Sequence, residues 1–118
     1  MTDQIQANLS LNVESTGYSV NPSWNFTDLL ASQFLCAGIQ TATTTFAAMT
    51  LGDMVTSDCG VLVLKNLDTN NYINYGSTQG EWKLDPGEFA FARMTPGTSI
   101  YLRANTANVK VEKYLLGK

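Results

Sequence analysis

The residues of this chain with the most potential for chemistry lie in a polar segment between two hydrophobic runs, at positions 65–76. Asp68, Asn70 and Asn71 could offer oxygen ligands to a calcium ion, but a calcium loop usually gathers several acidic residues and this segment has one. Asp and Asn also close turns, because their side chains hydrogen-bond to nearby backbone groups. We therefore interpret this segment as a turn, with a cation site as the alternative.

The sequence offers little for catalysis. It contains no histidine, which removes the commonest general base and the commonest metal ligand. Two pairs of carboxylates stand close in sequence, as a glycosidase would need, but acids beside turns commonly bond to the backbone. These pairs are Asp85 with Glu88 and Asp53 with Asp58. We expect a non-enzymatic protein that holds no metal or cofactor.

Three aromatic residues, Tyr72, Tyr75 and Trp82, follow the polar segment. Aromatic side chains beside Asn and Gly can stack on sugar rings, but in small β domains they more often pack in the core or at a subunit interface. We expect these three at an interface, with glycan binding as the alternative.

The composition limits the class of partner. A chain of 118 residues has the size of one domain, and 44% hydrophobic residues are enough for a core. Charged residues make up only 14%, and a net charge of −3 without a basic stripe argues against binding to nucleic acid. The sequence shows no membrane-spanning run and no signal peptide at its start. We expect cytosolic synthesis, with Cys36 and Cys59 more often free than bridged in such a setting.

The hydrophobic pattern has a period of two along most of the chain, which is typical of half-buried strands. Ile5, Leu9 and Leu11 alternate with polar residues up to Val13, and the β-branched content of 39–49 also favours a strand. The run at 61–64 is apolar on both faces, which predicts an interior strand. A helical turn is expected only at 28–34.

Two Pro-Gly turns separate the predicted strands of the C-terminal half, because Pro presets φ and Gly accepts positive φ in a type II turn. The residues expected to fix turns are Asp68, Asn70, Pro86, Gly87, Glu88, Pro96 and Gly97. We predict an all-β fold, a single β-sandwich of roughly eight or nine short strands, with a jelly-roll-like topology or a Greek-key or meander topology. It would span residues 1–118, with 1–13 as an edge strand or arm.

The order of motifs after Gly60 is distinctive: GVLVLKNLDTNNYINYG, then LDPGEFAFARM, then SIYLRANTANVKVEKYL. A strand that ends in Asn-Leu-Asp precedes a short turn, an Asn-Tyr-Ile strand, a Pro-Gly-Glu turn and a Tyr-x-x-Ala-Asn-Thr strand end. This order resembles that of small proteins encoded among the virion genes of tailed bacteriophages. The resemblance covers residues 60–116, with looser matches near Val20 and before Asp53.

The resemblance implies a structural virion protein, most simply a capsid decoration or cement protein, made in the bacterial cytoplasm and located in the virion. It brings no catalytic residues. The implied partners are the major capsid protein or other virion subunits and further copies of the chain, with a trimer expected. Neither nucleic acid nor membrane is expected as a partner. The residues expected at the interface are Ile5, Leu9, Leu11, Tyr72, Tyr75 and Trp82. The alternative is a tail-associated module that binds a receptor or glycan.

Overall fold

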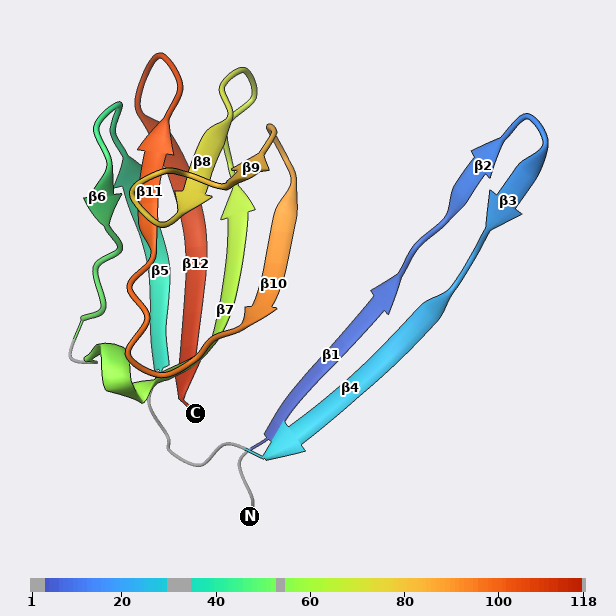
Figure 1. Ribbon diagram of the computed structural model, residues 1–118, viewed down its shortest axis with the longest axis horizontal. Coiled ribbons are helices and arrows are strands. Elements are labelled where there is room, and N and C mark those ends of the chain that lie inside the picture. The colour runs from blue at the N-terminus through green and yellow to red at the C-terminus, as the bar shows by residue number, and fades with distance from the viewer. Residues whose placement is uncertain (1–3, 30–34, 53–54, 118) are drawn as a thin grey trace. The chain divides into compact units, whose positions relative to one another are not determined.

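The structure is a computed structural model that describes residues 4–29, 35–52 and 55–117 (Figure 1). All regular elements of these residues are strands, apart from a 3-10 turn at Thr56–Asp58, so the prediction of an all-β fold is confirmed. The strands are β1 (Gln4–Ser10), β2 (Val13–Ser15), β3 (Tyr18–Val20), β4 (Ser23–Leu29), β5 (Leu35–Ala42), β6 (Ala47–Ala48), β7 (Cys59–Asn66), β8 (Ile73–Gly76), β9 (Trp82–Leu84), β10 (Phe89–Arg93), β11 (Tyr101–Ala104) and β12 (Val109–Gly117). They form four separate sheets, so the prediction of a single sandwich is not confirmed.

The backbone contacts divide the chain into two units, residues 1–31 and 32–118. The described part of the first unit is an antiparallel hairpin. β1 pairs with β4 and β2 pairs with β3 in the same register, and between the two ladders the Leu11 N–H donates to the Pro22 carbonyl at 2.9 Å. Gly17 has φ 99° at the tip, a conformation that glycine adopts readily. The helical turn expected at 28–34 is wrong for residues 28–29, which belong to β4, and its other residues lie outside the described ones.

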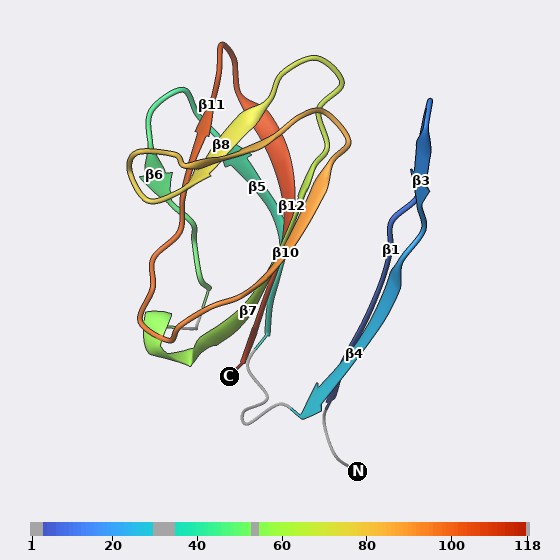
Figure 2. The ribbon, with the colours of Figure 1, turned by 45° about the vertical axis from the view of Figure 1, so that its right-hand side comes forward.

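The second unit pairs its first four strands with its last four in nested order. β5 pairs with β12, β6 with β11, β7 with β10 and β8 with β9, all antiparallel. β12 also pairs with β7, and β11 also pairs with β8, which completes two four-stranded sheets (Figure 2). Their strand orders are β10-β7-β12-β5 and β6-β11-β8-β9. β7 is interior, as its apolar run predicts.

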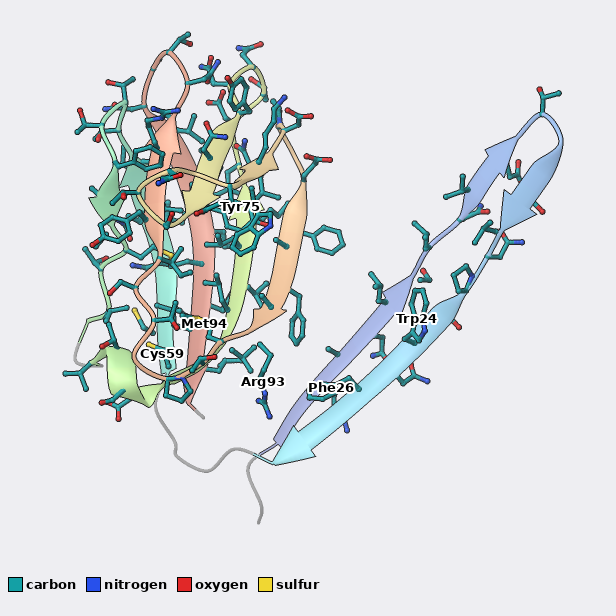
Figure 3. All side chains as sticks on the ribbon, in the orientation of Figure 1. Trp24, Phe26, Cys59, Tyr75, Arg93 and Met94 are labelled. Atoms are coloured by element: carbon teal, nitrogen blue, oxygen red, sulfur yellow. The ribbon has the colours of Figure 1, made fainter. Side chains whose placement is uncertain are left out.

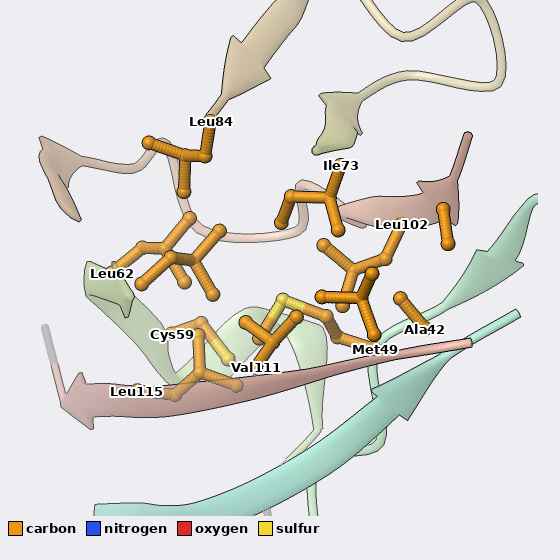
Figure 4. Close-up of a cluster of buried hydrophobic side chains, with 12 residues drawn as sticks. Ala42, Met49, Cys59, Leu62, Ile73, Leu84, Leu102, Val111 and Leu115 are labelled. Atoms are coloured by element: carbon orange, nitrogen blue, oxygen red, sulfur yellow. The ribbon is translucent and has the colours of Figure 1, made fainter. Parts of the chain in front are cut away.

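One hydrophobic core forms where side chains of these two sheets meet (Figure 4). The first sheet contributes Leu64, Val111 and Leu115, and the second contributes Ile73 and Leu102. Each of these side chains is at most 1% exposed. Burial of a Leu, Ile or Val side chain is worth about 1.5–3 kcal/mol, so this core is the main source of stability of the unit.

A buried asparagine fixes the chain where it leaves the first sheet. The Asn66 side chain is fully buried, and its Nδ2 donates to the carbonyls of Asn71 at 3.0 Å and Leu84 at 3.1 Å. Its Oδ1 accepts from the Asp68 N–H at 2.8 Å. Its backbone N–H donates to the Glu88 carbonyl, and its carbonyl accepts from the Gly87 N–H. One residue thereby joins the end of β7 to the 67–71 loop, to β9 and to the turn before β10.

We expect Asn66→Ala to lower the free energy of unfolding by roughly 2–3 kcal/mol, because it removes the partners of buried backbone carbonyls. Urea unfolding measures the difference. Asn70→Ala is the matched control, since Asn70 lies in the same loop and is exposed, and its effect should stay within about 0.5 kcal/mol. Equal effects of the two substitutions would contradict the role of Asn66.

Candidate functional site

Within the polar segment at 65–76, the one carboxylate, that of Asp68, bonds to the backbone of the same segment. Asp68 Oδ2 accepts from the N–H groups of Asn71 at 2.6 Å and Asn70 at 3.0 Å, and these bonds hold the pKa of Asp68 below its usual range. The Thr106 hydroxyl donates to Asn71 Oδ1 at 2.8 Å. Across the part of the chain that the structure describes, no group of three or more Cys, Asp or Glu side chains could hold a metal ion. The geometry is that of a side-chain-closed turn.

The acids proposed as carboxylate pairs also bond locally. Glu88 Oε1 accepts from the Asp85 N–H at 2.6 Å, and Lys83 Nζ lies 3.1 Å from Asp85 Oδ1. Asp58 Oδ2 accepts from the Val55 N–H at 3.3 Å, while Asp53 lies outside the described residues. The Glu88 carboxylate thus holds the backbone of the Pro-Gly turn, while the Asp85 carboxylate pairs with a lysine side chain.

Both Pro-Gly turns close with a hydrogen bond between their outer residues. The Glu88 N–H donates to the Asp85 carbonyl at 3.0 Å, and the Thr98 N–H donates to the Thr95 carbonyl at 3.1 Å. Gly87 and Gly97, the glycines after Pro86 and Pro96, have φ values of 80° and 94°. A side chain at either glycine would be strained, because L residues rarely adopt these φ values.

The structure brings together two of the three predicted aromatic residues. Tyr75, which is labelled in Figure 3, is the cross-strand partner of Trp82, in β8 and β9 respectively. Their ring centroids lie 5.6 Å apart, and Trp82 is 57% exposed. Tyr72 is not part of this pair. Lys83 Nζ lies over the Tyr72 ring, 4.4 Å from the ring centroid. Because successive side chains of a strand point to opposite faces, Lys83 and Tyr72 lie on the other face of this sheet from Trp82.

A buried lysine was missed by the sequence analysis. Lys113 is 4% exposed, and its Nζ donates to Gln40 Oε1 at 2.9 Å and to the carbonyl and hydroxyl of Thr50 at 2.5 Å each. These acceptors are uncharged, and burial lowers the pKa of the Lys113 ammonium. The signal was present in the sequence, since the alternation of Val109, Val111 and Leu115 places Lys113 on the same inward face.

One cavity and two thiols of the second unit were considered as ligand sites. A cavity of about 90 Å³ lies between Met49, Met94 and Ile100, well below the roughly 300 Å³ at which small-molecule pockets begin. Cys36 and Cys59 are both free thiols, and burial is the main cause that raises the pKa of Cys59.

One face of the N-terminal hairpin is apolar and exposed. The register pairs Leu9 with Trp24 on this face and Asn8 with Asn25 on the opposite, polar face. The exposed fractions are 51% for Leu9, 46% for Leu11, 42% for Val20 and 54% for Trp24. We call these four residues the hairpin apolar face. Ile5, also expected at an interface, pairs through its backbone with Asp28, and its side chain lies outside the described ones.

A second apolar surface lies on the β10-β7-β12-β5 sheet, on the face away from the core. The register aligns Phe91, Val63, Tyr114 and Ala37 in one row across the four strands. Phe89 and Ile39 stand at the two ends of the adjacent row, which contains Lys65 and Glu112 between them. Phe89 is 65% exposed, Ile39 63% and Tyr114 38%. We call these three residues the sheet patch.

Comparisons of the chain with protein-family models, with curated proteins and with solved structures found no match. Within the described ranges, no helix is long and apolar enough to cross a membrane. The two exposed apolar surfaces are the features on which a functional interpretation can be built, because exposed apolar patches mark interaction sites.

Asp68→Asn tests the turn through its pH dependence. The pKa of Asp68 is lower in the folded chain than the value of about 3.9 expected in the unfolded chain. Its stabilisation is therefore complete above that pH and is lost as the pH falls through the lowered pKa. We expect the wild type to be more stable than the variant at neutral pH and the gap to narrow below about pH 4 in urea titrations. A gap independent of pH would contradict this role.

Lys113→Met tests the buried ammonium at high pH. Between its lowered pKa and the value of about 10.4 in the unfolded chain, the folded state releases a proton that the unfolded state keeps. The stability of the wild type should therefore rise relative to the variant as the pH is raised from neutral toward about 10. Lys110→Met, on the exposed face of the same strand, is the matched control for the loss of a lysine. Identical slopes for both variants would refute the prediction.

Proposed function

We propose that this chain is a non-enzymatic structural protein of a tailed-bacteriophage virion, which decorates the capsid and stabilises it through contacts between subunits. The observation that carries the proposal is the hairpin apolar face, with Leu9 and Trp24 each about half exposed. An isolated two-stranded hairpin is at best marginally stable in water. Such a ribbon gains stability when a neighbouring subunit covers its apolar face, as in an assembly protein.

We further propose that residues 35–117 form a jelly-roll sandwich. The nested pairing of β5–β12, β6–β11, β7–β10 and β8–β9 supports this, since a long hairpin rolled into two four-stranded sheets has this strand order. Jelly rolls occur in viral capsid domains and in lectins. Because one fold serves many functions, the surfaces decide between them.

The chemistry of the surface also supports assembly. Charged residues make up 14% of the chain, so few charges need to be desolvated when a face is covered. The motif order of residues 60–116 resembles that of phage virion proteins. This resemblance is the reason for proposing a phage virion as the assembly. The partners in this proposal are the major capsid protein or other virion subunits and further copies of the chain, in the virion.

A second candidate function is a tail-associated module that binds a receptor or glycan. It is favoured by the paired rings of Tyr75 and Trp82, with Trp82 57% exposed. An aromatic ring with an open face can stack on a sugar.

Quantitative mass spectrometry of purified, DNA-filled particles tests the proposal. With labelled standard peptides from both proteins, we expect copies of this chain to equal those of the major capsid protein or a simple fraction of them, because a decoration protein follows the lattice. A ratio of a few per cent would instead support the tail module. Absence of the chain from the particles would refute both.

Particles that lack the chain provide the control for its role. They should release DNA at a lower temperature than complete particles, and purified wild-type protein added back should restore the release temperature. Unchanged release would show that the chain does not stabilise the shell.

A further inference from the structure

We propose that Thr50 and Gln40 react with each other in the folded chain to form an ester, with Lys113 as the base and ammonia as the second product. Gln40 lies in β5, which belongs to the first sheet, and Thr50 follows β6, which belongs to the second. The ester therefore links the two sheets at their β5 and β6 edges. This inference is independent of the proposed virion function, because it concerns a bond within one chain.

The register of β5 and β12 places Gln40 and Lys113 on the same face of the first sheet. Gln40 is the cross-strand partner of Val111, whose side chain is buried. Lys113 is the cross-strand partner of Gly38. Because residues two apart on a strand share a face, Lys113 and Gln40 are diagonal neighbours. Gly38 presents no side chain opposite Lys113, and the lysine side chain extends to Gln40 Oε1, 2.9 Å from Nζ.

The side-chain carbonyl of Gln40 is hydrogen-bonded in the way that an acyl-transfer enzyme holds its substrate carbonyl. Oε1 accepts from the Thr50 N–H at 2.9 Å and from Lys113 Nζ at 2.9 Å. Donors in these positions stabilise the negative charge that develops on the oxygen when a nucleophile adds to the carbonyl carbon. One of them is the N–H of Thr50 itself, just as the nucleophilic serine of a serine protease contributes its own N–H.

The Thr50 hydroxyl is close enough to attack this carbonyl. Oγ1 lies 3.1 Å from Gln40 Oε1. The carbonyl carbon is one bond of about 1.2 Å from Oε1, so it is at most about 4.3 Å from Oγ1. Atoms poised to react are roughly 3–3.5 Å apart, so at most about 1 Å remains to be closed. Groups that a fold holds together in this way react far faster than the same groups free in solution.

The hydrogen bonds of Lys113 assign it the role of base. Two of its three partners, Gln40 Oε1 and the Thr50 carbonyl, carry no hydrogen and therefore accept from N–H groups. A neutral amine has two N–H groups and one lone pair, so the lone pair faces the third partner, the Thr50 hydroxyl, at 2.5 Å. Burial favours this neutral form, because it lowers the pKa of Lys113. A lysine paired with a hydroxyl nucleophile is a known variant of the catalytic triad.

The reaction balances with the groups of the chain alone. Lys113 Nζ takes the Thr50 hydroxyl proton while Oγ1 forms a bond to Gln40 Cδ and the carbonyl electron pair moves to Oε1. When this pair forms the carbonyl again, the bond between Cδ and Nε2 breaks. Nε2 takes the proton from the Lys113 ammonium and leaves as ammonia. The amine of Lys113 is restored, nothing is oxidised or reduced, and the chain is lighter by one ammonia molecule.

Intact mass spectrometry of the denatured full chain tests the ester. We expect the wild type to be lighter than its composition requires by the mass of one ammonia molecule, and Thr50→Val and Gln40→Met to have their full masses. Thr50→Ser keeps the hydroxyl and should keep the loss. Thr41→Val is the matched control, because Thr41 is the partner of Lys110 on the exposed face of the same strands. A wild type of full mass, or a loss that persists in Thr50→Val, overturns the proposal.

Tryptic digestion identifies the attacking group. Both reacting residues lie in the peptide 1–65, so an ester leaves this peptide lighter by one ammonia molecule and releases 114–118 unchanged. Attack by Lys113 itself would block cleavage after that residue and join 1–65 to 111–118, which would overturn the ester. Hydroxylamine cleaves esters and leaves amides intact, so it should open the link in 1–65. Resistance to hydroxylamine would also contradict the proposal.

Two further variants separate the roles of the neighbouring groups. Cys36 is a second nucleophile, since its Sγ lies 3.8 Å from the Thr50 carbonyl. Cys36→Ala should retain the loss of ammonia, and a full mass in this variant would make the bond a thioester and overturn the proposal. Lys113→Met should have its full mass, whereas Lys110→Met should lose ammonia as the wild type does. An equal loss in both lysine variants would refute the role of Lys113 as the base. If Lys113→Met does not fold, Thr50→Val against Thr50→Ser still decides whether the ester forms.

Discussion

The second unit depends on the hydrogen bonds of one buried amide. Asn66 ends β7, the point at which the chain leaves the first sheet to build the second, and its side chain binds backbone groups of Asp68, Asn71 and Leu84. Buried backbone groups without partners are costly, and this one residue satisfies groups on three segments. The loop, β9 and the turn before β10 are thereby held in one arrangement, which sets the positions of Trp82 and Phe89.

The sequence was informative where local chemistry decides the structure. Alternation predicted strands, and the order of Pro86 and Gly87 predicted a turn, because both depend on neighbours in the chain. The pairing of strands could not be predicted from the sequence, because the hydrogen-bond partners of β5 lie in β12, at the far end of the unit. For the same reason the strand expected at 39–49 is divided: β5 ends at Ala42 and β6, in the other sheet, begins at Ala47.

The candidate surfaces show the same limit. Leu9 and Leu11 were selected because they alternate with polar residues, and both are exposed in the hairpin. Ile39, Phe89 and Tyr114 could not be selected, because an apolar residue in a strand is exposed or buried according to which face the other sheet covers. Lys113 shows the converse, a charged residue that its strand alternation places inside. Which apolar residues are exposed and which charged residues are buried can be assigned only when the strand register and the packing of the sheets are known.

The place of β12 has a consequence for biosynthesis. This strand is the last of the unit, yet it lies between β5 and β7 and hydrogen-bonds to both. In a nascent chain on the ribosome, the apolar run of β7 therefore cannot pair with β12 until residues 109–117 have been made. Folding that depends on pairing between strands far apart in sequence is slow. Until the pairing is complete, the unpaired apolar strands can aggregate. Overproduction at low temperature, where synthesis is slower and apolar association weaker, should accordingly raise the soluble yield.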